Sequence, residues 1–467
     1  MAASVLPTSK GTRILCAAAL LLSFVYVLVS FPDDVLCRVA AIGFLAAVSI
    51  PLVMMRELDV FSPLSILALS FYFYCFVGAI NLLSSNQTYF FSVNIAEQLP
   101  AMYLLATIAM LGLLAGWQFG VSRGKASYNY SERTASVAGV VLNVAAVASF
   151  VLYFVLSGNF VDKSRLLPEV ENRTGVASIG YLLQGFDLCV PGLVLLNSST
   201  TKWARRTAYF FTIVLLPLAL STGFRSNVVK AIAPIVLAWY LQRQRRPSAK
   251  LCFVIALAAI LIFASIGLVR SGQATFADAF TSAALFDREL LLSDLNTIQA
   301  MCMVIAKVPE QFDYLWGESI RYVPIHLLPR SLFPDKGVAP EVQLVWDATD
   351  RYAGFAIPIF GLFYLNFSYP GAFVGMALVG YFVSKVYHGF RKNPSLRRAQ
   401  AYLMVIYLLA YLAFPRHSFV QTLTQVVYVF CPLLVLDLLE IAPATWCAWS
   451  NGPVYISRPA RRVEVNS

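Results

Sequence analysis

Long apolar runs separated by short polar connections make up most of this chain. A run of about 20 apolar residues is long enough to cross the roughly 30 Å hydrocarbon core of a bilayer as a helix. The pattern predicts about twelve transmembrane helices, at 14–31, 39–55, 64–83, 101–121, 135–157, 177–196, 207–221, 226–241, 251–269, 355–388, 400–415 and 419–440. We therefore expect an all-α, polytopic integral membrane protein whose residues 1–467 form a single transmembrane domain.

The tenth predicted span, 355–388, is too long for one straight crossing. It contains the sequence Asn366-Phe-Ser-Tyr-Pro-Gly371. Irregular backbone at membrane depth must line a cavity or be buried in protein. We expect a broken or re-entrant segment at this place.

The fourth predicted span carries Gly112, Gly116 and Gly120, which repeat every four residues. Small residues at this spacing let two helices approach closely. We expect them to pack against another helix of the same chain, and the alternative is a dimer interface.

The longest hydrophilic stretch of the chain, residues 270–354, lies between the ninth and tenth predicted spans. Every second connection along the chain is basic, and basic connections stay on the cytoplasmic side. The basic clusters are Lys10 with Arg13, Arg123 with Lys125 and Arg133, Lys202 with Arg205 and Arg206, Arg243 with Arg245, Arg246 and Lys250, Arg391 with Lys392, Arg397 and Arg398, and Arg458 with Arg461 and Arg462. This alternation predicts cytoplasmic termini and a large extracytoplasmic loop at 270–354.

Composition supports the membrane class. The chain is 59% hydrophobic and 13% charged, whereas soluble domains are about 45–50% apolar and about 25% charged. The net charge of +11 does not indicate a nucleic-acid partner, because the cations lie in short connections and set the topology. The expected surroundings are the lipid bilayer.

The eight cysteines show no CxxC pair and no zinc-ligand spacing. Most lie in apolar runs, where cysteine acts as a small hydrophobic residue. Cys37 and Cys302 fall on the predicted outer side, so a disulfide between them is one expectation.

Several catalytic signatures are absent from the sequence, among them the Walker A, GxSxG, HExxH and Rossmann glycine patterns. The chain has three histidines, too few for a zinc site to be expected. We expect no cofactor and no metal, and we expect no ATP hydrolysis.

Cations on the predicted outer side are the remaining candidates for chemistry. Arg225 lies in the polar turn Ser221-Thr-Gly-Phe-Arg-Ser-Asn227, and such a turn has backbone donors that can bind an anion. Lys230 lies about one turn further along. The others are Arg270, Arg321, Arg330 and Lys336. The alternative for each is that the side chain reaches the membrane interface without any further role.

Asp187 lies within the sixth predicted span. An ionisable residue inside a span needs a charged partner or a wet cavity. Asp187 either forms a structural ion pair with Lys230 or Arg225, or it lines a site.

Three segments resemble the bacterial O-antigen polymerases, also called oligosaccharide repeat-unit polymerases. Thr222-Gly-Phe-Arg-Ser226 is similar to a turn of that family, and Leu328-Pro-Arg-Ser-Leu-Phe-Pro-Asp-Lys336 is similar to its loop motif. Gly337 stands where the family pattern has proline. Gly354-Phe-Ala-Ile-Pro-Ile-Phe-Gly361, with Tyr364-Leu-Asn-Phe367 and Gly371, resembles the segment after the loop. The resemblance covers roughly 220–385.

The resemblance implies a metal-independent membrane glycosyltransferase of O-antigen or other surface polysaccharide synthesis. It would transfer a growing glycan from polyprenyl diphosphate to the next lipid-linked repeat unit at the periplasmic face of the bacterial inner membrane. Its substrate would be a polyprenyl-diphosphate-linked glycan, and its pathway partners would be a chain-length regulator and a flippase.

This chemistry assigns roles to the candidate residues. Fixed cations can stabilise the charge of a leaving diphosphate, and a carboxylate or histidine can serve as base. The candidates for substrate binding are Arg225, Arg270, Arg330, Lys336, Lys230 and Asp187. The candidates for the base are His326, Asp335 and Glu341. A lipid-linked glycan ligase, a flippase and a proton-coupled transporter that uses Asp187 and Lys230 stay open as alternatives.

Overall fold

The protein is described by a computed structural model. It describes residues 10–31, 34–55, 62–84, 89–91, 93–120, 130–157, 182, 184–221, 225–243, 297–328, 337–349, 357–392, 397–412 and 419–450.

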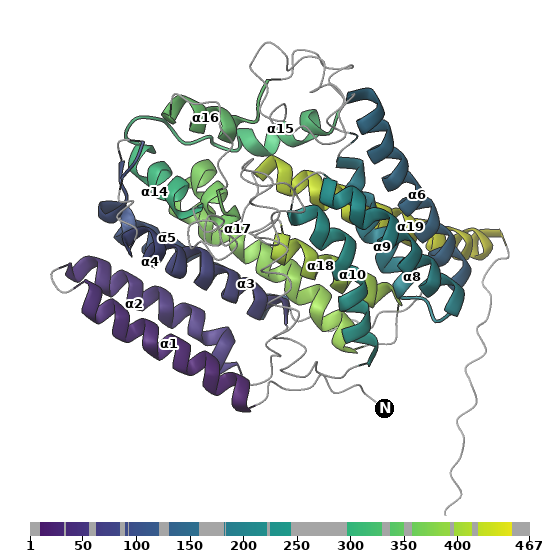
Figure 1. Ribbon diagram of the computed structural model, residues 1–467, viewed down its shortest axis with the longest axis horizontal. Coiled ribbons are helices and arrows are strands. Elements are labelled where there is room, and N and C mark those ends of the chain that lie inside the picture. The colour runs from purple at the N-terminus through teal and green to yellow at the C-terminus, as the bar shows by residue number, and fades with distance from the viewer. Residues whose placement is uncertain are drawn as a thin grey trace, which may run out of the picture.

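The described residues are mostly helical (Figure 1). The first half of the chain forms α1 (Lys10–Ser30), α2 (Val35–Ser49) continued by the π-helical turn η1 (Ile50–Met54), α3 (Pro63–Phe71) continued by η2 (Tyr72–Val77) and α4 (Gly78–Ser84), the two-residue strands β1 (Tyr89–Phe90) and β2 (Val93–Asn94), α5 (Ile95–Phe119) and α6 (Glu132–Ser157). The strands pair as an antiparallel hairpin. In Figure 1, α1 and α2 lie side by side at one edge of the molecule.

The second half of the chain begins with the 3-10 turn η5 (Gly185–Leu188) and α8 (Cys189–Asn197). It continues with α9 (Lys202–Ser221), α10 (Arg225–Arg243), α14 (Thr297–Lys307), α15 (Glu318–Leu327), α16 (Pro340–Thr349), α17 (Ile359–Lys392), α18 (Arg397–Leu412) and α19 (Phe419–Ser450).

Seven helices in the described part of the chain are long and apolar enough to cross a membrane. They are Arg13–Ser30, Val35–Met54, Pro63–Ser84, Ile95–Phe119, Glu132–Leu156, Ile359–Lys392 and Thr422–Leu439. They correspond to predicted spans one to five, ten and twelve. Helices α8, α9, α10 and α18 overlap the sixth, seventh, eighth and eleventh predicted spans, and the ninth, at 251–269, lies outside the described residues.

The glycine stripe on α5 packs within the chain. A Cβ atom at Gly112 would lie 2.3 Å from the carbonyl oxygen of Phe373, and one at Gly116 would lie 1.8 Å from that of Ala377. On the opposing helix, a Cβ at Gly380 would lie 2.1 Å from the Leu113 carbonyl oxygen. The backbones of α5 and α17 are therefore in direct contact, as the intramolecular interpretation of the stripe predicts.

The disulfide considered between Cys37 and Cys302 is wrong, because both side chains are free thiols. Cys37 lies in the first turn of α2 and Cys302 in α14, and both are fully buried. Both helices pack on α5. The two cysteines act as small apolar side chains in this packing.

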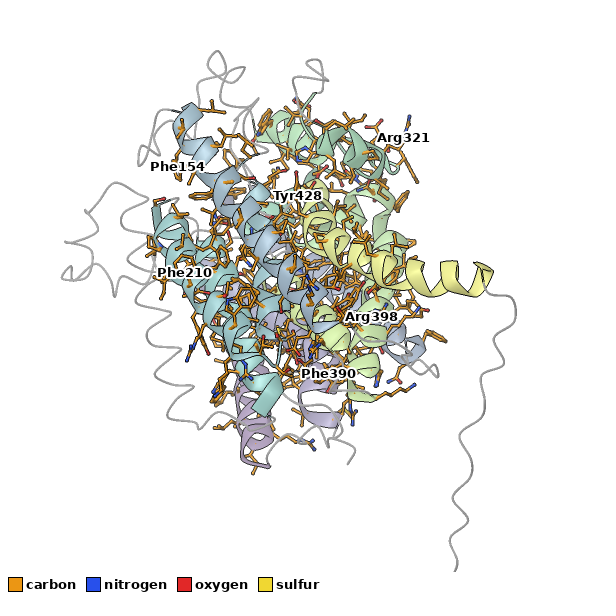
Figure 2. All side chains as sticks on the ribbon, turned by 90° about the vertical axis from the view of Figure 1, so that its right-hand side faces the viewer. Phe154, Phe210, Arg321, Phe390, Arg398 and Tyr428 are labelled. Atoms are coloured by element: carbon orange, nitrogen blue, oxygen red, sulfur yellow. The ribbon has the colours of Figure 1, made fainter. Side chains whose placement is uncertain are left out.

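Ion pairs connect the start of α18 to two neighbouring helices. Arg398 binds Asp437 of α19 in a bidentate manner through one edge of its guanidinium, with Nη2 to Oδ2 at 2.7 Å and Nε to Oδ1 at 2.9 Å. The Arg397 Nη2 atom lies 3.0 Å from Oε2 of Glu132 on α6. Figure 2 shows Arg398 well below Arg321. Predicted cytoplasmic cations thus fasten α6, α18 and α19 together.

Candidate functional site

In Figure 1, α15 and α16 of the 270–354 segment lie at one end of the bundle, and α14 lies below α16 beside α5. These three helices and the chain between them are called the outer layer, after the side of the membrane that the sequence predicts for them. Helix α14 is buried against α5, and its Lys307 Nζ donates to the Ala348 carbonyl of α16 at 2.6 Å. The Tyr322 hydroxyl of α15 donates to the Gly337 carbonyl just before α16. The three described helices of this segment are therefore linked to one another by hydrogen bonds.

Beneath this layer the transmembrane helix α17 is broken. Phe367 has φ −147° and ψ 25°, and Ser368 has φ 61° and ψ −158°. The break separates a short piece, 359–366, from a piece at 369–392 that is itself long enough to cross a bilayer. The broken segment expected around 366–371 is confirmed, and Pro370 and Gly371 lie directly after the break.

The outer layer docks on this break through its backbone. The Leu315 N–H donates to the Leu365 carbonyl at 2.9 Å. The Gly317 N–H donates to Oδ1 of Asn366 at 3.2 Å, and Nδ2 of Asn366 donates to the Leu362 carbonyl at 2.9 Å. A break deprives helical carbonyls of their usual donors, so the loop backbone supplies one of the missing partners.

Both sides of this junction have unusual backbone. Trp316 has φ 44°, Gly317 has φ 89° and Ser368 has φ 61°. Positive φ is rare for bulky residues and costs free energy, so the surrounding contacts must hold it. Gly317 precedes the first turn of α15, where glycine adopts positive φ without a Cβ clash.

Tyrosines surround the junction and extend its contacts. The Tyr364 hydroxyl donates to the Val308 carbonyl at 3.0 Å, which connects α17 to the end of α14. The Tyr364 ring lies 5.8 Å from the ring of Tyr314 and 5.3 Å from that of Tyr369. Trp316, beside Tyr314, is 64% exposed. Edge-to-face aromatic packing thus reinforces the hydrogen-bonded docking.

The two described candidates for the base lie on neighbouring helices of the layer. His326 is half-buried in the last turn of α15, with its ring centroid 6.0 Å from that of Tyr322. Glu341 lies in the first turn of α16 and is only 1% exposed. Helices α15 and α16 are in contact. Of these two residues, His326 is the more accessible to a substrate.

Four candidates of the loop and its flank, Arg270, Arg330, Asp335 and Lys336, lie outside the described residues. The chain on either side of 329–336 is described. Leu328 directly follows α15, and the Gly337 carbonyl accepts the Tyr322 hydroxyl of the same helix. Leu328 and Gly337 are therefore both held at α15. Arg321, also on α15, is exposed and lies near the top of Figure 2.

Asp187 and Lys230 form an ion pair between η5 and α10. Lys230 Nζ donates to Asp187 Oδ1 and lies 3.5 Å from Oδ1 of Asn227. Both charged residues are buried, at 4% and 7% exposed. The sequence left the partner of Asp187 open between Lys230 and Arg225, and the structure pairs it with Lys230. Arg225 is the first residue of α10. The structure describes the backbone of Arg225 but not its side chain.

The docking residues Gly317 and Asn366 were not among the predicted site residues. A signal was present for Asn366, because it begins the polar interruption of an apolar run. Their distance of 49 positions in sequence hid their contact. Within the described residues, no group of three or more His, Cys, Asp or Glu side chains is arranged to hold a metal ion.

The helices define the general class as a multi-pass membrane protein. The sequence profile of the O-antigen polysaccharide polymerase Wzy family matches residues 13–349. The chain belongs to this family, and the resemblance seen in its motifs is confirmed. Comparison with curated proteins and with solved structures returned no match.

Proposed function

We propose that this protein polymerises lipid-linked oligosaccharide repeat units. It transfers the growing glycan from polyprenyl diphosphate to the next lipid-linked repeat unit, at the periplasmic face of the bacterial inner membrane. The family match carries this proposal, since it extends from residue 13 to residue 349 and so includes all nine candidate site residues. In this proposal the chain has twelve spans, cytoplasmic termini and a periplasmic loop at 270–354, and it works with a flippase and a chain-length regulator.

The reaction breaks the bond between the anomeric carbon of the donor and its diphosphate, and it forms a glycosidic bond to an acceptor hydroxyl. The negative charge develops on the diphosphate, so Arg225, Arg270, Arg330 and Lys336 are proposed to hold it. A base within hydrogen-bond reach takes the proton of the acceptor hydroxyl. His326 is the preferred base because Glu341 is almost completely buried, and Asp335 is the remaining candidate.

Lys230 is a weaker candidate for the diphosphate. Its charge is compensated by Asp187, and a buried cation that already has an anionic partner has little attraction left for a second anion. The pair therefore supports the structural alternative for these two residues.

The direct test uses the purified protein in proteoliposomes with lipid-linked repeat units as the only substrate. We expect lipid-linked polymer to form without ATP and in the presence of EDTA, because the donor diphosphate bond supplies the energy. Absence of polymer would refute the proposal. Activity that is lost on chelation and returns with magnesium or manganese would give the acidic residues of the loop a metal-binding role.

Two variants test the cations in the same assay. Arg225→Ala and Arg330→Ala are expected to lower polymer formation by about 100-fold or more, the loss typical of a removed charge-stabilising donor. Lysine at either position should rescue poorly, because it lacks the planar guanidinium fork. Arg206→Ala is the control, an exposed arginine in a predicted cytoplasmic connection. Wild-type polymer from Arg225→Ala would mean that Arg225 only reaches the membrane interface.

Gene deletion separates polymerase from ligase. Loss of the polymerase leaves single repeat units on the final lipid, whereas loss of a ligase leaves finished polymer on the polyprenyl carrier. Accumulation of carrier-linked polymer would contradict the proposed step.

A further inference from the structure

We propose that Asn366 is a positioning residue that fixes the outer layer, and with it the proposed catalytic loop, on the break in α17. This inference rests on the proposed function for its consequence in the reaction. The contact itself does not depend on that function.

The side chain of Asn366 uses both ends of its amide. Its Nδ2 donates to Leu362 within the short piece of α17, and its Oδ1 accepts the N–H of Gly317 from the outer layer. Asn366 is 1% exposed. At such burial water does not readily replace a lost partner, so the amide selects one place for the Gly317 backbone.

The second hydrogen bond of the junction depends on the same geometry. Leu315 donates to Leu365, the residue before Asn366. Two neighbouring bonds from one loop segment to one helical turn fix both the position and the direction of that segment. A Cβ atom at Gly317 would also lie 3.2 Å from Cζ of Phe367. The backbone at Gly317 therefore packs directly against the break in α17, too closely for a larger side chain.

The junction is placed directly before α15. Helix α15 begins at Glu318 and carries Arg321 and His326. A displacement at Gly317 would therefore move both of these side chains. Errors of about 1 Å in the position of reacting groups can cost about 100-fold in rate, which is why a bond outside the reaction centre can matter for turnover.

The first test replaces Asn366 with leucine, which keeps the number and branching of the side-chain heavy atoms and removes both hydrogen bonds of the amide. Asn143→Leu is the matched control. Asn143 is also fully buried, and its Nδ2 donates to the carbonyl four residues earlier, Gly139, at 2.7 Å within α6. Its bond lies within one helix and does not involve the outer layer.

We expect Asn366→Leu to increase hydrogen exchange at residues 315–321 and to lower kcat by about tenfold or more, with KM changed less than about twofold. Asn143→Leu should leave both the exchange at 315–321 and kcat close to wild type. Unchanged kcat in Asn366→Leu overturns the proposal, whether or not exchange increases. Equal losses in both variants, together with a lower Tm, also overturn it, because they show general destabilisation.

A second pair of variants approaches the junction from the loop and serves if Asn366→Leu does not fold. Gly317→Ala places a Cβ against Phe367 at a residue with φ 89°, whereas a Cβ at Gly389, near the other end of α17, meets nothing within 4 Å. Gly317→Ala should reproduce the increased exchange and the lower kcat, and Gly389→Ala should not. Equal behaviour of the two alanine variants would refute the proposal. If the wild-type protein makes no polymer, the proposed function fails, and the exchange comparison alone decides whether the junction holds α15.

Discussion

The ion pair of Asp187 and Lys230 joins the short turn η5 to α10 inside the helical bundle. Burial makes each charge costly, and each is tolerated because the other compensates it. Removing one partner would therefore leave an uncompensated buried charge. Removing both would leave none.

Lys230→Met is expected to lower the free energy of unfolding by about 3–5 kcal/mol, the usual cost of breaking a buried pair. The double variant Asp187→Asn with Lys230→Met should regain most of this loss, because no buried charge remains. Thermal unfolding in detergent measures both effects. The double variant should also make polymer of normal length, and a stable double variant without polymer would instead place the pair in the active site.

Between elements, the most extensive contact within the described residues is the one between α5 and α17. Small residues on both helices let their backbones touch, and this contact holds the helix that carries the break. The position of the break, and so of the outer layer docked on it, depends on the fit of these two helices.

Gly116→Ala tests that fit. The added Cβ would lie 1.8 Å from the Ala377 carbonyl oxygen, so the helices must separate, and overpacking of this kind typically costs about 1–3 kcal/mol. We expect a lower Tm in detergent and reduced accumulation in membranes. Gly43→Ala on α2 is the control, because its Cβ would meet nothing within 4 Å. Equal Tm values for the two variants would show that the helices are not in backbone contact at Gly116.

For the whole molecule, the proposed reaction requires residues 270–354 to face the compartment that contains the lipid-linked substrate. The alternation of basic connections predicts that this is the outer side. The structure adds that α15 and α16 lie at one end of the bundle (Figure 1). Because these helices lie together, we expect α15 and α16 to be exposed on the same side of the membrane.

Cysteine accessibility checks the orientation in a variant without the native cysteines. In intact cells whose outer membrane admits the reagent, a membrane-impermeant thiol reagent should modify Ser331→Cys and leave Ser395→Cys unmodified. Permeabilised inner membranes should make both accessible, which controls for reactivity. Labelling of Ser395→Cys alone in intact cells would reverse the predicted topology.

The amino-acid sequence by itself determined the membrane class, the early spans, the small-residue stripe of α5 and the interruption at 366–371. These features depend on the length of an apolar run or on a spacing within one helix, so a local pattern is enough to predict them. Tertiary structure decided which partner each feature meets. Only the fold places Gly112 and Gly116 on α17, pairs Asp187 with Lys230, leaves Cys37 and Cys302 unbonded and docks Gly317 on Asn366. These contacts join residues far apart in sequence, and a local pattern shows that a side chain needs a partner without specifying which distant residue packing brings to it.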